Sequence, residues 1–160
     1  VAAQMASVPV IVVAVDLSPE GERLAEVLRT AVTRMLTIEP DARIACVNVI
    51  KTARIGIDQG TDDQGNNLHV VRLVALKQWA DSIDLPDHRL TYTVLEGSDP
   101  GQAILDYATT NHVDHIVMGA RGHSTTRRYL GSVSAQVVAE AHCSVTVIRL
   151  PERREDAEAA

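Results

Sequence analysis

Residues 10–15 read Val-Ile-Val-Val-Ala-Val and are followed by Asp16. A continuous run of β-branched residues predicts a strand that is buried on both faces, as in a parallel sheet. Ser18-Pro19 comes next and offers a helix cap followed by a proline suited to the first helical position. Apolar residues then recur at helical spacing to about Thr37. The opening of the chain therefore predicts a strand followed by a helix.

This strand–helix unit recurs to the end of the chain. The alternation of the two elements predicts an α/β fold, a doubly wound five-stranded parallel sheet with helices on both faces. The third strand alternates polar and apolar residues, which predicts a place nearer the sheet edge. The further strands are predicted over residues 43–50, 90–95, 115–118 and 144–148, and the further helices over 68–83, 100–111 and 132–138, the last two capped by Asp99 and Ser132.

The length of 160 residues predicts one domain, over residues 1–150, with a disordered polar tail at 151–160. The first residue is Val1 instead of Met, as expected for a trimmed chain or a piece of a longer protein. No signal peptide and no apolar run of about 20 residues is recognisable. Cys46 and Cys143 lie far apart and form no metal or redox spacing. These features predict a reduced, cytoplasmic protein.

Charge and aromatic content narrow the classes of ligand. The net charge is −6, which argues against a general nucleic-acid binder and against a protein of the membrane surface. The chain has no Phe, one Trp and three Tyr, so it lacks the aromatic residues on which single-stranded nucleic acids stack. A nucleobase would have to be held by aliphatic side chains and backbone groups.

A glycine-containing segment follows the fourth predicted strand. Gly119 and Gly122 lack a Cβ atom, so backbone N–H groups there can approach an anion closely. Gly131-Ser132 then opens a helix, whose first N–H groups favour phosphate. Between residues 115 and 139 there is no acidic residue, while three arginines are present, at positions 121, 127 and 128. These features indicate an anion site; alternatively, the arginines are ordinary solvated side chains and the glycines are turn residues.

The same residues resemble those of a known family. Gly119-x-x-Gly122 with Gly131-Ser132 is similar to the nucleotide loop of the universal stress proteins. The resemblance implies a Rossmann-like fold, related to that of the adenine nucleotide alpha hydrolases, with strand order 3-2-1-4-5. The resemblance covers nearly the whole chain and extends to Asp16-Leu17-Ser18, Asn48-Val49-Ile50, Gly97 and the closing Cys143–Ile148. In the ATP-binding pattern nine residues separate the second and third glycines, whereas eight separate Gly122 from Gly131 here.

The resemblance implies an adenine-nucleotide site, for ATP or AMP, with or without Mg²⁺. Its residues are assigned by position only. Ala14, Val15 and Asp16 would border the adenosine and the phosphates, with Asp16 a candidate Mg²⁺ ligand; Val49 would contact the adenine; Met118, Gly119, Arg121 and Gly122 would line the ribose and phosphate side; and Gly131, Ser132, Val133 and Ser134 would cradle the phosphates. The alternatives are a turn or cap carboxylate for Asp16 and simple core packing for Val49.

Two functions of different class remain open. The first is a stress-response regulator in which bound nucleotide alters the surface that an unidentified protein partner meets. The second is a dimeric interaction module, part of a larger signalling protein, that has lost nucleotide binding. No residue stands out as a general base for phosphoryl transfer, which favours binding over enzymatic activity, although slow ATP hydrolysis stays open.

The last predicted strand indicates the assembly. Residues Ser144–Leu150 form an apolar terminal strand whose edge needs covering. In the family this strand pairs with its own copy, so we expect a homodimer. A metal site at His112-x-x-His115 is the weaker interpretation of that pair, because the two residues straddle a helix end and a strand start.

Overall fold

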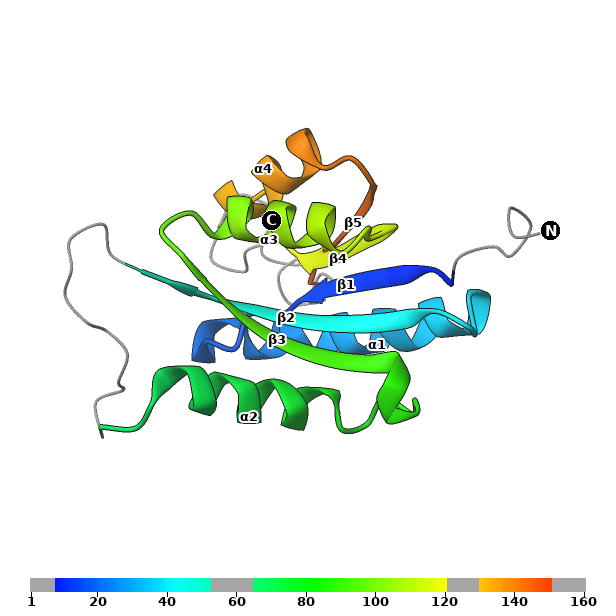
Figure 1. Ribbon diagram of the computed structural model, residues 1–160, viewed down its shortest axis with the longest axis horizontal. Coiled ribbons are helices and arrows are strands. Elements are labelled where there is room, and N and C mark those ends of the chain that lie inside the picture. The colour runs from blue at the N-terminus through cyan, green and yellow to red at the C-terminus, as the bar shows by residue number, and fades with distance from the viewer. Residues whose placement is uncertain (1–7, 53–64, 121–129, 151–160) are drawn as a thin grey trace, which may run out of the picture.

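The computed structural model describes residues 8–52, 65–120 and 130–150. Strands and helices alternate along these segments as the sequence predicts (Figure 1). The elements are β1 (Val10–Ala14), η2 (Pro19–Gly21), α1 (Glu22–Ile38), β2 (Arg43–Lys51), α2 (Leu68–Ala80), η3 (Asp87–Arg89), β3 (Leu90–Gly97), α3 (Pro100–Thr110), β4 (His115–Gly119), α4 (Ser132–Glu140) and β5 (Ser144–Ile148).

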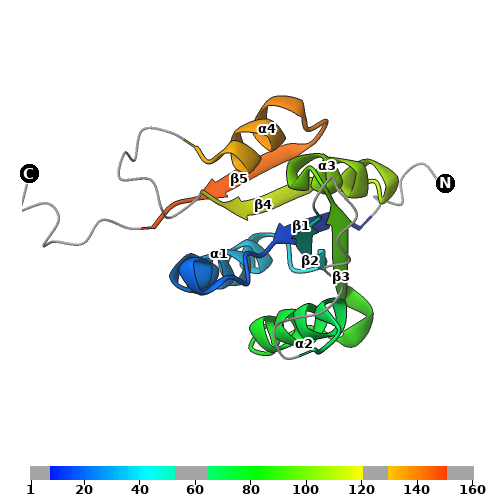
Figure 2. The ribbon, with the colours of Figure 1, turned by 90° about the vertical axis from the view of Figure 1, so that its left-hand side faces the viewer.

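The strands form one five-stranded parallel sheet in the order β3-β2-β1-β4-β5, which confirms the predicted fold class and strand order. Figure 2 shows this order across the sheet, with α1 and α2 on one face and α3 and α4 on the other. β3 lies at one edge, as its alternating sequence predicts. β1 lies at the centre, where Ile11, Val12 and Val13 are at most 1% exposed.

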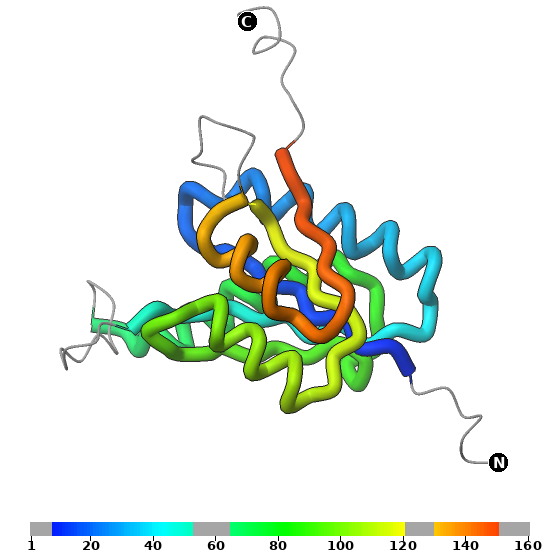
Figure 3. Tube along the Cα trace, turned by 90° about the horizontal axis from the view of Figure 1, so that it is seen from above, coloured from blue at the N-terminus to red at the C-terminus, as the bar shows by residue number. Residues whose placement is uncertain are grey.

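The side chains of β1 alternate between two apolar cores. Val13 packs with residues of α1 and α2, including Leu28 and Trp79. Val12 packs on the opposite face with residues of α3 and α4, including Val137. A strand in this position needs apolar residues at every site, because both of its faces are covered. Figure 3, seen from the α3 and α4 side, shows these two helices lying next to each other over the sheet.

A helix boundary differs from the sequence prediction at Ile83 and at Ser132, whereas Asp99 and Ser18 stand at the predicted cap positions. Ile83 lies beyond the end of α2 but is only 5% exposed, so its apolar character reflects burial in a turn and not a helical position. Asp99 does cap α3, and its side chain accepts a hydrogen bond from the Gln102 N–H. Ser132 is the first residue of α4, and its cap is Gly131, so the predicted serine cap is wrong by one position. Ser18 precedes the short helix η2 and makes no side-chain cap bond.

In the described parts of the chain, no helix is long and apolar enough to cross a membrane.

Candidate functional site

The strand order reverses between β1 and β4, and this reversal locates the candidate site. From β1 the chain proceeds outward through β2 to β3, whereas β4 and β5 lie on the other side of β1. The crossovers therefore leave in opposite directions, and sheets of this kind bind ligands at such a reversal, which here is at the carboxyl ends of β1 and β4. Ala14 and Met118 are paired neighbours at these two ends. Figure 2 views the molecule from this edge of the sheet.

Predicted site residues from four separate segments pack on the same face of the sheet. Ala14, Val49 and Val133 all pack against the apolar cluster that contains Met118. They come from β1, β2, α4 and β4. Val15, by contrast, is 3% exposed and packs in the core on the opposite face of the sheet, with residues of α1 and α2. Arg121 and Gly122 lie outside the described residues, as do residues 53–64 of the loop after β2.

Asp16 follows β1 and has a defined role in the local turn. Its Oδ1 accepts a hydrogen bond of 2.9 Å from the Ser18 N–H. A Cβ atom on Gly21 would lie 2.5 Å from Asp16 Oδ2, so this glycine makes room for the carboxylate. Asp16 is therefore a turn carboxylate, the alternative interpretation of this residue from the sequence. The side chain remains exposed, which leaves it accessible to a cation brought by a ligand.

A single carboxylate of this kind fits Mg²⁺ only in company with a nucleotide. Mg²⁺ keeps several waters and is commonly held by one or two carboxylates together with substrate phosphates. No group of three or more metal-binding side chains is present in the described segments. Nor does the predicted histidine pair converge there: His115 Nε2 lies 2.6 Å from Thr146 Oγ1, while His112 is exposed after the end of α3.

Gly119, at the end of β4, is constrained by packing against α1. A Cβ atom at this position would lie 2.5 Å from Leu24 Cδ2 and 2.7 Å from Leu24 Cγ. Its backbone φ angle is not positive, so conformational freedom does not explain the glycine. The sequence interpretation, in which Gly119 only makes room for a phosphate, is incomplete because α1 occupies the space beside it.

The first turn of α4 presents backbone donors to the same edge. The Gly131 carbonyl accepts hydrogen bonds from the Ala135 N–H at 2.9 Å and from the Ser134 hydroxyl at 3.1 Å. Ser134 is 2% exposed, so its hydroxyl serves the helix and only its backbone N–H is left for a ligand. The N–H groups of the first helical turn have no acceptor within the helix, and the helix dipole favours an anion there. Ser132 is exposed at this end.

Two residues near the site were missed by sequence reasoning. Asn48, in β2, is 4% exposed and donates from Nδ2 to the Val15 carbonyl at 2.8 Å. Its Oδ1 accepts a hydrogen bond of 3.2 Å from Arg72 Nη1, on α2. The available signal was a single amide inside the otherwise apolar run 44–50.

Comparison with known proteins identifies the family of the chain. The model of the universal stress protein family matches residues 8–149. The chain belongs to the universal stress protein family. A universal stress protein of Methanocaldococcus jannaschii is 39% identical over 61 residues, a match that covers 38% of this chain and 35% of that protein. The aligned part thus spans about a third of the length of this curated relative.

Solved structures of universal stress proteins share the fold. A family member from Arabidopsis thaliana with AMP bound has a TM-score of 0.62 at 19% identity, over 92% of this chain and 94% of that one. A universal stress protein in complex with cAMP also has a TM-score of 0.62, at 18% identity, over 91% of this chain and 100% of that one. At these identities the likeness establishes the fold.

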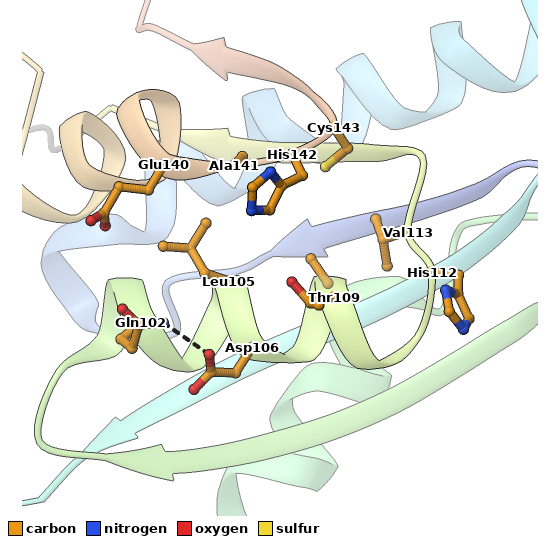
Figure 4. Close-up of a pocket in the computed structure, with 11 residues that line it drawn as sticks. Gln102, Leu105, Asp106, Thr109, His112, Val113, Glu140, Ala141, His142 and Cys143 are labelled. Carbon is orange, nitrogen blue, oxygen red and sulfur yellow. Dashed lines mark hydrogen bonds between the residues drawn. The ribbon is translucent and has the colours of Figure 1, made fainter.

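The universal stress protein domain also carries a groove on the face of the sheet that α3 and α4 cover. It lies between α3 and the segment that leads from α4 into β5 (Figure 4). Its volume is about 660 Å³, and Leu105, Thr109, Glu140 and His142 are among the residues that line it. None of the predicted site residues lines this groove. The groove is therefore distinct from the candidate site at the carboxyl ends of β1 and β4.

The two cysteines do not supply a reactive thiolate to this domain. Burial raises the pKa of the Cys46 thiol to about 12. The pKa of Cys143 is also raised, first by burial and then by the nearby charge of Asp114. Both thiols are therefore protonated at neutral pH, and a thiol is a poor nucleophile compared with its thiolate.

Proposed function

We propose that this chain binds an adenine nucleotide, ATP or AMP, at the carboxyl ends of β1 and β4. The observation that carries the proposal is the meeting of an apolar surface and a helix N-terminus at the point where the strand order reverses. Ala14, Val49 and Met118 supply aliphatic contacts suited to a base and ribose. The first turn of α4, beginning at Ser132, supplies backbone N–H groups suited to phosphates.

Relatives of the chain support this assignment. The Arabidopsis thaliana family member has AMP bound, and another universal stress protein was crystallised with cAMP. Both ligands contain adenine, ribose and phosphate, the three chemical features that the proposed site would hold. The segment with Arg121 and Gly122 follows directly after β4 in the chain, and we propose that it completes the phosphate side. If Mg²⁺ accompanies ATP, Asp16 is the residue that would hold it, and the ion would neutralise phosphate charge.

We further propose that the bound nucleotide serves regulation. No residue stands out in the sequence as a general base, so the proposal is a binding role with at most slow hydrolysis. Occupancy would change the carboxyl edge that a protein partner meets during a stress response. The cytoplasmic location stays a prediction from sequence.

β5 supports a homodimer as part of this function. Among the described strands it pairs only with β4, and each of its five residues retains some solvent exposure. The Ile148 carbonyl accepts from Ala120, so the even-numbered residues of β5 direct their backbone groups to β4. The N–H groups of Val145 and Val147 therefore point to the open edge, where a second copy of β5 would supply acceptors.

Calorimetry with ATP, AMP and cAMP tests the nucleotide site, and Gly131→Val is the sharpest variant. Gly131 has φ −63° and ψ 163°, a conformation that valine adopts without strain, so the fold should survive. The added side chain obstructs the phosphate approach. Losing one hydrogen bond to a charged group costs about 1.5–3 kcal/mol, or roughly ten- to a hundred-fold in affinity.

Gly97→Val is the matched control. Gly97 also ends a strand at the carboxyl edge, but on β3, and a Cβ there makes only an ordinary contact with Ala103 at 3.7 Å. We expect its affinity for ATP to equal that of the parent. Unchanged ATP binding by Gly131→Val would mean that the phosphates lie elsewhere. A parent protein that binds none of the three nucleotides would favour the alternative, an interaction module without a nucleotide.

A further inference from the structure

The two buried polar residues of the described chain both lie at the candidate site. They are Asn48, beside Val49, and Ser134, in the first turn of α4. A buried amide is costly unless its donor and acceptor are both used. Asn48 uses both, because Nδ2 donates to the Val15 carbonyl and Oδ1 accepts from Arg72. Arg72 thereby fixes which end of the amide faces β1.

The direction of the backbone groups along β2 is set by its two neighbours. The Arg43 N–H bonds the Pro9 carbonyl, so odd-numbered residues of β2 face β1. The Thr52 N–H bonds the Gly97 carbonyl, so even-numbered residues face β3. Val49 is odd-numbered, and its N–H and C=O therefore point toward the β1 side, beyond the point where β1 ends.

A regular parallel ladder would use the Val49 N–H at this point. The Val15 N–H donates to the Val47 carbonyl at 2.9 Å, and the next bond in a parallel pair runs from the Val49 N–H to the Val15 carbonyl. That bond is absent from the hydrogen bonds between these described residues. The side chain of Asn48 takes its place, donating to the same carbonyl.

We infer that Asn48 is a positioning residue for base recognition. It occupies the Val15 carbonyl, and so it leaves the N–H and C=O of Val49 available to a ligand. This inference rests on the proposed adenine-nucleotide site. The N–H and C=O of this one residue place a donor beside an acceptor on the same side of the strand, which matches the N1 acceptor and N6 donor of adenine. Guanine carries the O6 acceptor where adenine has the N6 donor, so the same two groups disfavour it.

The binding experiment compares ATP, GTP and inorganic tripolyphosphate on the parent and on Asn48→Leu, a variant of similar shape without hydrogen bonds. We expect Asn48→Leu to bind ATP about ten-fold more weakly, the effect of one hydrogen bond, because Val49 closes onto Val15. The preference for ATP over GTP should fall, while tripolyphosphate affinity stays unchanged. A merely structural defect would weaken all three ligands together.

Variants of Arg72 show whether the orientation of the Asn48 amide, and not the packing around it, controls ATP binding. Arg72→Leu should act in the same direction as Asn48→Leu, and Arg72→Lys should restore ATP affinity because lysine still donates to Oδ1. Arg89→Leu is the matched control, since its guanidinium also donates to oxygen acceptors, the backbone carbonyls of Pro40 and Ala42, but near the amino end of β2. Its ATP-to-GTP preference should equal that of the parent. If Asn48→Leu does not fold, Arg72→Leu carries the same test.

Amide exchange measured by NMR tests the arrangement without a nucleotide. In the ligand-free parent the Val49 amide should exchange faster than that of Val47, and adenosine should slow it. A Val49 amide as protected as that of Val47 in the free parent overturns the inference. So does ATP binding by Asn48→Leu with unchanged affinity and preference. A parent that binds no adenine nucleotide instead refutes the proposed function, and the exchange of the free protein still reports on Asn48.

Discussion

Gly119→Ala should destabilise the domain through its contact with α1. The added Cβ would lie 2.5 Å from Leu24 Cδ2, whereas unstrained carbon contacts lie at about 3.5–4.0 Å. Leu24 is 7% exposed, so it has little room to move by the required ångström. Overpacking of this kind costs about 1–3 kcal/mol, and we expect a loss of about 2 kcal/mol in the free energy of unfolding, measured by urea denaturation.

A double-mutant cycle assigns this loss to the contact. Leu24→Ala alone should cost about 2–5 kcal/mol because it leaves a cavity. In the double variant the new methyl group enters that cavity, so the combined loss should be smaller than the sum by about 1–2 kcal/mol. Additive losses, or a Gly119→Ala variant within about 0.5 kcal/mol of the parent, would refute the packing argument.

The same cycle separates packing from ligand binding at Gly119. The double variant keeps the Cβ atom but removes the overlap with Leu24. If Gly119 serves only packing, the double variant should bind ATP as the parent does. If the glycine also makes room for a phosphate, its affinity should stay reduced after the overlap is relieved. Titration calorimetry on the four proteins of the cycle measures the difference.

Two further predictions concern assembly and pH. The parent should sediment as a dimer at tens of micromolar, and Val147→Pro should be monomeric because it removes an N–H from the open edge of β5; Glu96→Pro, at the opposite edge of the sheet, should remain dimeric, and a monomeric parent would contradict the β5 interface. The pKa of Cys46 is raised from 9.0 to about 12 on folding, so the folded state holds its proton more tightly and stability should fall as pH rises from about 9 to 12. Cys46→Val should flatten this decline, measured by urea denaturation at a series of pH values. If the free energy of unfolding of Cys46→Val fell with pH as steeply as that of the parent, burial would not raise the pKa of the Cys46 thiol.

Local sequence patterns were sufficient for the order of elements and for the centre of the sheet. The run at residues 10–15 is apolar at every position, which only a strand covered on both faces requires. The alternating residues of β3 likewise indicated an edge. Each of these signals arises from the burial of individual side chains, which hydrophobicity along the chain records directly.

The sequence proposes a place for the candidate site, but it does not show how the residues there pack. The glycines after β4 and before α4 led to the proposed site at the carboxyl ends of β1 and β4, because strand ends and helix starts can be read from a single chain. Their spacing did not reveal that Gly119 faces Leu24, a residue 95 positions earlier in the chain. The one-residue error at the α4 cap has a similar origin, since both Gly131 and Ser132 suit a cap and the final choice depends on how the helix meets the sheet.

The sequence by itself determined the fold class, because the alternation of strands and helices follows from burial patterns and turn residues, and the family resemblance supplied the strand order. Only the tertiary structure decided which backbone groups stay open at the carboxyl end of β1. Asn48 takes the Val15 carbonyl because β1 stops beside it, and Arg72 orients its amide from a helix 24 residues further along. Such hydrogen bonds depend on directions and distances between segments, and a pattern along one strand does not contain them.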